Sequence, residues 1–266
     1  MAGQVANTHG GSSASHPGPP DAERLAELIR SSACTVALTG AGISVPSGIP
    51  DFRTPGEGIW EKVDPMEVAH IDAFRADPAR FWGFYRPRFQ TLGEVEPNPA
   101  HQALAELERR GLLEAVITQN IDMLHVKAGS ERVIEVHGSI RTSSCPECGG
   151  RFEITEVEAM FGQGDVPECP ACIAAVKPDV VLFGELLPAE AMAEAEALAG
   201  RAELMLCIGS SLEVYPVAGL PSVTLARGGR LGIITKGPTP FDPDAAVRMD
   251  GDVVGELEAV LAALPE

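Results

Sequence analysis

The stretch "CTVALTGAGISVPSGIPDFR", residues 34–53, decides the fold, because it joins a buried strand to a glycine-rich turn. It begins as a continuous apolar run that closes at Gly40, which is typical of a strand buried on both faces. The glycines lie at positions 40, 42 and 48, which is not the spacing of the usual dinucleotide fingerprint. They would still let the backbone approach a pyrophosphate at the start of a helix. A tight turn without a ligand explains them as well.

The end of this stretch carries charges that a simple turn does not need. Asp51 and Arg53 flank Phe52 in a segment rich in proline and glycine. This arrangement favours a polar site under an apolar cover, with a surface turn as the alternative. The irregular pattern continues to Val95, which is long for a loop and predicts a functional lid over residues 51–95.

Further apolar runs along the chain alternate with helical patterns. Helices are predicted at 21–32, 98–111, 188–199, from near Pro216, and at about 252–264. Solid apolar strands separated by helices predict an α/β fold with a parallel sheet covered on both faces. Ligands bind such sheets at the carboxyl ends of the strands. The predicted strands are "LEAVITQN" (113–120), "RVIEVHG" (132–138), "PDVVLFGE" (178–185), "ELMLCIGSS" (203–211) and "RLGIITKG" (230–237).

Composition narrows the class of protein. The chain has 266 residues, 45% of them hydrophobic, and a formal charge of −18. Such a charge argues against binding to nucleic acid or to anionic membranes, because both need clustered basic residues. Residues 1–20 are rich in Gly, Ser and Pro and predict a disordered tail. Without an apolar signal sequence or membrane span, the expected location is the cytoplasm.

Two cysteine pairs predict a metal site. "CPEC" at 145–148 and "CPAC" at 169–172 have the spacing of a tetrahedral zinc site with Cys145, Cys148, Cys169 and Cys172 as ligands. Four thiolates leave no open position, so the zinc would be structural. A redox-active or disulfide pair is the alternative. Cys34 and Cys207 lie in apolar strands and are expected to be core residues.

Polar residues crowd the ends of two predicted strands. "TQNID" places Thr118, Gln119, Asn120 and Asp122 at the end of one strand, which favours ligand contact, although Asn120 alone could be a helix cap. His137 ends the next strand and would face the same cleft as a general base. His125 is the competing candidate, and His70 and His101 have no comparable setting.

Taken together, these motifs resemble those of the sirtuins, the NAD-dependent protein deacylases. The order GAGIS-x-x-SGIPDFR, TQNID, HGS, two zinc knuckles, FGE and GSS-L-x-V-x-P spans residues 21–264. The resemblance implies a Rossmann-like large domain (21–52, 92–139 and 177–264) with helices on both faces of its sheet. It also implies a smaller inserted domain, made of a helical segment (53–91) and a zinc module (140–176).

The resemblance implies NAD as co-substrate and an acyl-lysine protein or peptide as substrate. The acyl group would pass to ADP-ribose as nicotinamide leaves, with His137 as base and Asn120 assisting. Phe52 would shield the reacting carbon. The implied NAD-binding residues are Gly40, Ala41, Gly42, Ser44, Asp51, Phe52, Arg53, Gln119, Asn120, Ile121, Asp122, Gly209, Ser210, Ser211, Thr235 and Val253.

The same resemblance implies a peptide groove and an acyl pocket. Val181, Phe183, Gly184 and Glu185 would form one side of the groove, and Glu213, Val214 and Tyr215 the other. Class III sirtuins, which remove malonyl, succinyl and glutaryl groups, bind the acyl carboxylate with a Tyr-x-x-Arg pair beside a small residue. The matching positions are Tyr85, Arg88 and Ala69, with core packing of Tyr85 and a surface role for Arg88 as the alternative.

Some residues depart from these patterns. Asp51 and "GSSLEVYP" are closer to simple bacterial deacetylases than to class III, and Thr235 replaces an asparagine that contacts the adenosine ribose. Three other functions are alternatives to an NAD-dependent deacylase. A hydride-transferring dehydrogenase would need the regular fingerprint. A mono-ADP-ribosyltransferase could use the same cleft, and a zinc-stabilised NAD-binding module would lack turnover.

Overall fold

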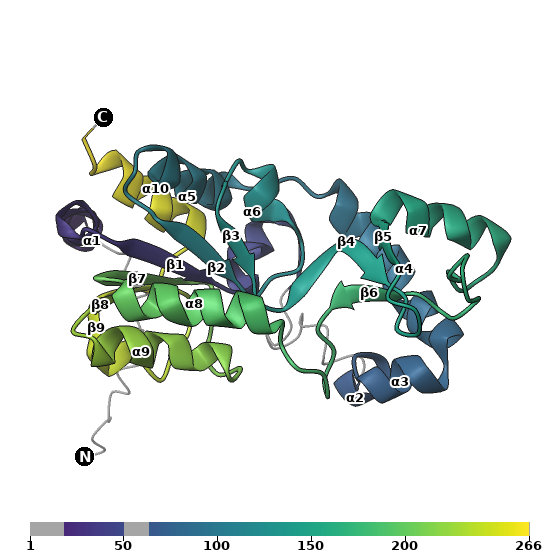
Figure 1. Cartoon of the computed structure of the whole chain (residues 1–266). Coiled ribbons are helices and arrows are strands. Elements are labelled where there is room, and N and C mark those ends of the chain that lie inside the picture. The colour runs from purple at the N-terminus through teal and green to yellow at the C-terminus, as the bar shows by residue number, and fades with distance from the viewer. Residues whose placement is uncertain (1–18, 51–63, 266) are drawn as a thin grey trace, which may run out of the picture.

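The computed structural model describes residues 19–50 and 64–265, and its largest element is a six-stranded parallel sheet (Figure 1). The strand order is β3-β2-β1-β7-β8-β9, and every neighbouring pair is parallel. The prediction of a doubly covered parallel sheet is confirmed. The strands are β1 (Thr35–Thr39), β2 (Ala115–Thr118), β3 (Val133–Glu135), β7 (Leu204–Ile208), β8 (Arg230–Ile234) and β9 (Ala245–Met249).

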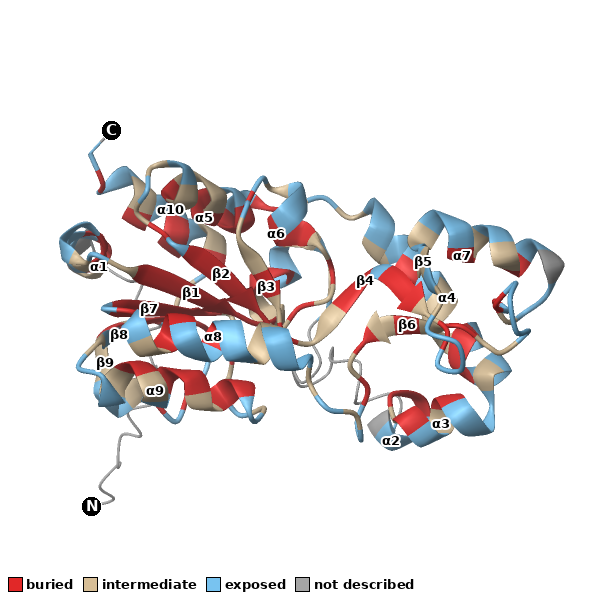
Figure 2. Cartoon of the chain, viewed as in Figure 1, coloured by how far each residue is buried: buried red, intermediate tan, exposed pale blue. Residues whose placement is uncertain are grey.

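Helices cover both faces of this sheet and form a core on each (Figures 1 and 2). On one face lie α1 (Pro19–Ser31), α5 (Pro99–Arg109) and α10 (Val253–Ala262). On the other lie α8 (Ala189–Arg201) and α9 (Leu220–Ala226). The residues of β1, β2 and β7 are fully buried, which explains why their sequences are solid apolar runs.

A second, three-stranded sheet lies beside the first. It consists of β5 (Arg151–Glu153), β4 (Gly138–Ser144) and β6 (Lys177–Val180), and its strands are antiparallel. The prediction that "PDVVLFGE" is a strand of the parallel sheet is therefore wrong. β6 alternates between partly and fully buried residues, as expected for a sheet with one exposed face. The edge strand β9 was not predicted from the sequence.

Residues 64–94 have an irregular sequence pattern, and the resemblance implied a helical segment over 53–91; in the structure they are mostly helical. They form α2 (Pro65–Val68), α3 (Ile71–Ala76) and α4 (Pro78–Glu94). The Asp77 side chain caps α4 by accepting a hydrogen bond from the Arg80 N–H. The aromatic residues of α4 pack with β4 and α7 (Ile154–Met160) in a third core. Within it, the indole of Trp82 donates to the Val176 carbonyl at 2.9 Å, so the helical segment is fixed to the cysteine-bearing half of the chain.

None of the helices in residues 19–50 and 64–265 is long and apolar enough to cross a membrane.

Candidate active site

Two glycine turns meet at the carboxyl ends of β1 and β7. The Gly42 N–H donates to the Gly209 carbonyl at 2.8 Å, and the Gly40 N–H donates to the Ile208 carbonyl at 3.0 Å. A Cβ on Gly42 would lie 2.8 Å from Gly209 Cα, and a Cβ on Gly209 would lie 2.3 Å from the Ile43 nitrogen. Only glycine fits at these contacts, and Gly209 also has a φ of +62°. The two turns therefore pack backbone against backbone at the end of the sheet where parallel sheets bind dinucleotides.

A buried polar cluster lies under the first turn. The Ser44 hydroxyl donates to Asp122 Oδ2 at 2.6 Å and accepts from Asn120 Nδ2 at 3.1 Å. The Asn120 amide also donates to the Gly40 carbonyl, so it links the end of β2 to the turn after β1. Burial raises the pKa of Asp122, and the bond from Ser44 opposes this shift. The structure therefore brings together the residues predicted from "GAGIS" and "TQNID".

Gln119 and Ile121 connect this cluster to both sheets. The Gln119 side chain donates to Ser210 Oγ at 2.9 Å, which joins the ends of β2 and β7. The Ile121 carbonyl accepts from the Ile140 N–H of β4 at 3.3 Å. Ser210 Oγ also accepts from the Leu212 N–H and so shapes the turn that contains Ser211. These contacts fix the polar rim of the sheet before any ligand binds.

The adenosine end of the predicted cofactor site is less densely bonded. Thr235 follows β8 and is buried, and its hydroxyl makes one long contact of 3.5 Å with the Lys236 carbonyl. Val253 is the first residue of α10 and is buried in the core under the sheet. Ala41 begins the short 3₁₀ turn Ala41–Ile43 that follows β1. Asp51, Phe52 and Arg53 lie outside the described residues.

The two candidate bases differ sharply in their surroundings. His137 is half-buried, and its Nδ1 lies 3.0 Å from the Gln119 carbonyl oxygen. Burial lowers the pKa of His137, and the contact with Gln119 opposes this shift. His125 is 2% exposed, its Nε2 contacts Thr39 Oγ1 at 2.9 Å, and burial lowers its pKa to about 3. His125 is therefore a buried structural residue, and His137 is the accessible one.

The predicted substrate segment, residues 181–185, is hydrogen-bonded directly to this histidine. The Val181 N–H donates to the main-chain carbonyl of His137 at 2.8 Å. Phe183 bonds to residues on its other side, because its N–H donates to the Ala69 carbonyl at 2.8 Å. Glu185 accepts from the Leu182 N–H and forms an ion pair with Lys177 at 3.0 Å. The segment thus lies between His137 and the helical segment.

Exposed apolar side chains mark the predicted groove. Tyr215 is 69% exposed, Phe183 48% and Leu186 94%. Tyr215 and its neighbours Glu213 and Val214 follow β7, whereas Phe183 and Leu186 follow β6. Each side of the predicted groove thus carries one exposed aromatic side chain, Phe183 on one side and Tyr215 on the other.

The predicted acyl-pocket residues are only partly brought together. Ala69 is buried and contacts the substrate segment through its carbonyl, as described above. Tyr85 packs between Phe81 and Phe89, and burial raises its pKa to about 12, so it stays a protonated donor. The Arg88 guanidinium is exposed, lies 3.5 Å from the centre of the Phe84 ring and donates to the Phe84 carbonyl. In this structure Arg88 thus folds back on its own helix.

A family model described as "Sir2 family" matches residues 40–216. The chain belongs to the Sir2 family. An NAD-dependent protein deacetylase from Thermotoga maritima is 46% identical over 86% of this chain and 92% of its own. An NAD-dependent protein deacylase 2 from Archaeoglobus fulgidus is 44% identical over 91% and 94%. A Sir2 structure with a deacetylated p53 peptide and 3′-O-acetyl ADP-ribose superposes with a TM-score of 0.86, at 43% identity, over 91% and 99% of the two chains.

Four cysteines of this chain, two from each predicted zinc knuckle, meet at one point. The sulfurs of Cys145, Cys148, Cys169 and Cys172 all lie within 4.8 Å of one another. The pairs Cys145–Cys172 and Cys148–Cys169 are 3.4 and 3.5 Å apart. Four thiolates around one zinc at 2.3 Å would be separated by about 3.8 Å, so the cluster fits a tetrahedral ion. These residues would hold a structural zinc.

Sequence reasoning did not predict that His101 and Thr39 support the candidate site from beneath. His101 is fully buried, its Nε2 lies 3.4 Å from Ser44 Oγ, and burial lowers its pKa to about 4. Thr39 and Thr118 share a bond of 2.9 Å that extends the network to His125. One signal was available, because His101 lies on the apolar face of α5 with Ala100 and Leu104. A polar residue on a core-facing stripe is rarely buried without a partner.

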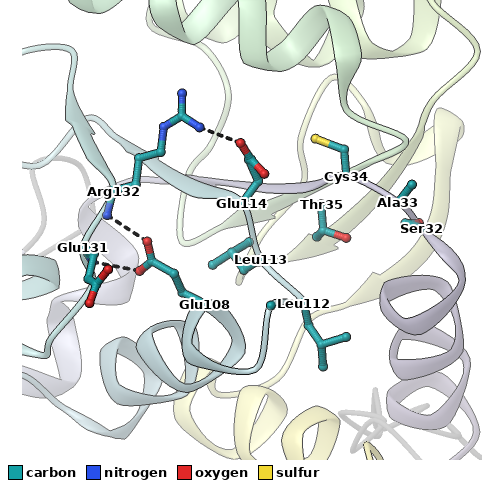
Figure 3. A pocket seen from close by; sticks show the side chains of 11 residues that line it. Ser32, Ala33, Cys34, Thr35, Glu108, Leu112, Leu113, Glu114, Glu131 and Arg132 are labelled. Carbon is teal, nitrogen blue, oxygen red and sulfur yellow. Dashed lines mark hydrogen bonds and ion pairs between the residues drawn. The ribbon is translucent and has the colours of Figure 1, made fainter.

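A separate cavity of about 510 Å³ lies at the amino ends of the strands, opposite the candidate site (Figure 3). It is lined by residues that precede β1, β2 and β3, including Cys34 and Arg132. Three of its charged side chains have partners: Glu114 accepts from Arg132 Nη1, and Glu108 accepts from the Glu131 and Arg132 main-chain N–H groups. Burial raises the pKa of the Cys34 thiol, which keeps it protonated and unreactive. This cavity does not belong to the candidate site.

Proposed function

We propose that this chain is an NAD-dependent protein lysine deacylase that forms nicotinamide, free lysine and an O-acyl-ADP-ribose. The observation that carries the proposal is the position of His137. Its side chain is anchored to Gln119 of the "TQNID" rim, while its main-chain carbonyl holds Val181 of the substrate segment. One residue therefore touches both the predicted dinucleotide site and the predicted peptide site. The named activities of the similar proteins support the same function.

The contact with Gln119 defines which nitrogen can act as the base. A carbonyl oxygen can only accept, so Nδ1 of neutral His137 carries the proton and Nε2 keeps its lone pair. Nε2 would take a proton from the ribose hydroxyls and so prepare the 2′-oxygen for attack on the acyl carbon. When bound, NAD supplies a good leaving group, nicotinamide, and no hydride moves. No side-chain nucleophile is needed.

The polar cluster would hold the nicotinamide ribose. Gln119 and Asn120 would contact its hydroxyls, Asp122 the carboxamide, and Ser44 would orient Asp122 through the bond of 2.6 Å. Gly42 and Gly209 would let the backbone approach the pyrophosphate. Gly40, Ala41, Ile121, Ser210, Ser211, Thr235 and Val253 would complete the site toward the adenosine, and Asp51, Phe52 and Arg53 would close it.

An acyl-lysine peptide would bind by strand addition between residues 181–185 and 213–215. The exposed side chains of Phe183 and Tyr215 support a groove at this position. For the acyl group, we propose acetyl as the basic substrate and acidic acyl groups as an additional one. Tyr85 is a protonated donor, whereas Arg88 would have to leave the Phe84 ring to reach an acyl carboxylate.

The test is incubation of the purified protein with NAD and matched acetyl, succinyl and malonyl peptides, analysed by mass spectrometry. Release of nicotinamide with O-acyl-ADP-ribose supports the proposal. ADP-ribose attached to protein instead would indicate a mono-ADP-ribosyltransferase. Arg88→Ala should lower succinyl turnover at least tenfold and leave acetyl turnover unchanged, because a buried carboxylate loses its charged partner. Unchanged succinyl turnover would show that Arg88 does not read the acyl group.

A further inference from the structure

The residues before α3 form a short strand pairing with the substrate segment. The Phe183 N–H donates to the Ala69 carbonyl at 2.8 Å, and the Ile71 N–H donates to the Phe183 carbonyl at 3.0 Å. These two bonds form an isolated parallel bridge between His70 and Phe183. Both main-chain groups of Phe183 are therefore used by residues 69–71. The position of the substrate segment depends on where these three residues lie.

The side chain of His70 strengthens this connection in two separate ways. Its Nδ1 accepts a hydrogen bond from the Asp72 N–H at 3.1 Å, which caps α3. The other edge of the ring faces Gly184, because a Cβ on Gly184 would lie 2.8 Å from His70 Nε2 and 3.0 Å from Cε1. Gly184 has a φ of +85°, so this close approach coincides with a left-handed backbone. The ring therefore packs directly against the bend of the substrate segment.

We propose that His70 is a positioning residue for substrate binding, whose imidazole ring holds Gly184 in the shape that an acyl-lysine peptide requires. This inference rests on the deacylase function proposed above. The ring fills the space behind Gly184, so its removal would leave the bend free to shift toward α3. A preorganised segment binds a peptide more tightly because less freedom is lost on binding. His70 would thus set the KM for the peptide, while the NAD site, formed by other strands, would be unaffected.

Two variants separate the ring from the helix cap. His70→Asn keeps an acceptor for the Asp72 N–H but removes the ring, whereas His70→Phe keeps a ring and loses the cap. Glu67→Ala is the matched control, since it breaks an exposed ion pair with Arg80 in the same helical segment, away from Gly184. Steady-state kinetics with an acetyl-lysine peptide and with NAD, and thermal unfolding, are measured for all of them.

If the ring positions Gly184, His70→Asn should raise the KM for the peptide about five- to tenfold, with kcat and the KM for NAD within about twofold. Its melting temperature should stay close to that of the wild type. His70→Phe should have a peptide KM near the wild-type value and a lower melting temperature. A wild-type peptide KM for His70→Asn would overturn the proposal, and so would a peptide KM for His70→Phe as high as that for His70→Asn.

Peptide binding by calorimetry, without turnover, separates this inference from the proposed function. A wild-type protein that binds the acetyl-lysine peptide but releases no nicotinamide would refute the deacylase function. The His70 series would then still be compared by its dissociation constants. Weaker peptide binding by His70→Asn than by Glu67→Ala supports the positioning role, and equal binding refutes it.

Discussion

His137 Nδ1 lies 3.0 Å from the main-chain oxygen of Gln119, so the half-buried ring has a fixed tautomer, with its lone pair on Nε2. Replacement by alanine should lower deacylation by about 10²- to 10⁴-fold, the scale of losing a general base. Folding and zinc content should be unchanged, because no strand or cysteine depends on the ring. Nicotinamide and deacylated peptide are measured by chromatography. Activity close to the wild-type value would show that another group is the base.

The pH dependence of this activity follows from the burial of His137. Burial lowers its pKa, so the neutral base persists at a lower pH than in an exposed histidine. We expect kcat/KM for the peptide to decline in acid with a midpoint below 6.5, the ordinary pKa of histidine. A profile of kcat/KM from pH 5 to 8 checks this. A midpoint above 6.5 would contradict the lowered pKa.

The stability of the fold should fall in acid because of His101 and His125. Burial lowers their pKa values to about 4 and about 3, below the ordinary 6.5, so the unfolded chain binds more protons between these values. Unfolding is therefore favoured as the pH falls from 6.5 to 4, by about 3 kcal/mol for His101 alone. Asp122, with its raised pKa, acts in the opposite sense just above 3.8. Urea unfolding at several pH values measures the slope, which should flatten in His101→Asn.

Close packing of the two glycine turns predicts that Gly42→Ala damages NAD binding. The added Cβ would lie 2.8 Å from Gly209, against backbone that cannot move aside. We expect a loss of stability of about 2 kcal/mol or more and a KM for NAD raised about tenfold. Gly83→Ala is the control, because α4 has open space at this position. Equal behaviour of the two variants would mean that the turns are not tightly constrained.

Loss of any cysteine of the cluster should release the metal. Cys145→Ser should reduce bound zinc from one ion per chain to almost none and unfold the three-stranded sheet, because the four ligands close the site. Cys34→Ser should keep the metal, since Cys34 lies outside the cluster. Elemental analysis and near-UV circular dichroism check both variants. Zinc retained at full occupancy in Cys145→Ser would argue against a tetrahedral thiolate site.

A longer side chain at position 235 should improve cofactor binding. The Thr235 hydroxyl makes a weak contact of 3.5 Å with the Lys236 carbonyl, at the position where the sirtuin resemblance implies an asparagine. Thr235→Asn should lower the KM for NAD about threefold, the effect of one additional hydrogen bond. The KM for the peptide should not change. A raised KM for NAD would show that the adenosine ribose does not approach this residue.

Sequence reasoning predicted those parts of the fold in which a short stretch of sequence is compatible with only one kind of element. The buried strands β1, β2 and β7 are solid apolar runs, and Asn98 before Pro99 predicted the start of α5. Sequence reasoning failed where the structure of a segment depends on the elements that pack or pair with it. β6 continues into an apolar run, yet it pairs with β4, because the sequence of a strand does not state its neighbour. Likewise, α4 contains Pro87 and many aromatic residues, and its helical form depends on packing around Trp82.

The candidate site was predictable where the polar residues follow strands, as at Asn120, Asp122 and His137. The supporting residues were not, because His101 lies 57 residues from Ser44 in the sequence and meets it only in the folded chain. The position of the Arg88 side chain could not be predicted either, because the contacts of a long exposed side chain depend on its neighbours in the folded chain. For Asp51, Phe52 and Arg53 the prediction stands untested.

Gly138, which follows His137 directly, has a φ of +76°, and a Cβ there would lie 2.0 Å from the Asp179 oxygen. The chain leaves the six-stranded sheet for the three-stranded one at this step, so His137 lies at the junction of the two sheets. A rotation of one sheet away from the other that widens the cleft would also change the orientation of the His137 ring. We therefore expect the enzyme with a widened cleft to be inactive. NAD would then not be hydrolysed until a peptide binds to both parts of the chain. The corresponding observation would be that nicotinamide is released far more slowly without peptide than with it.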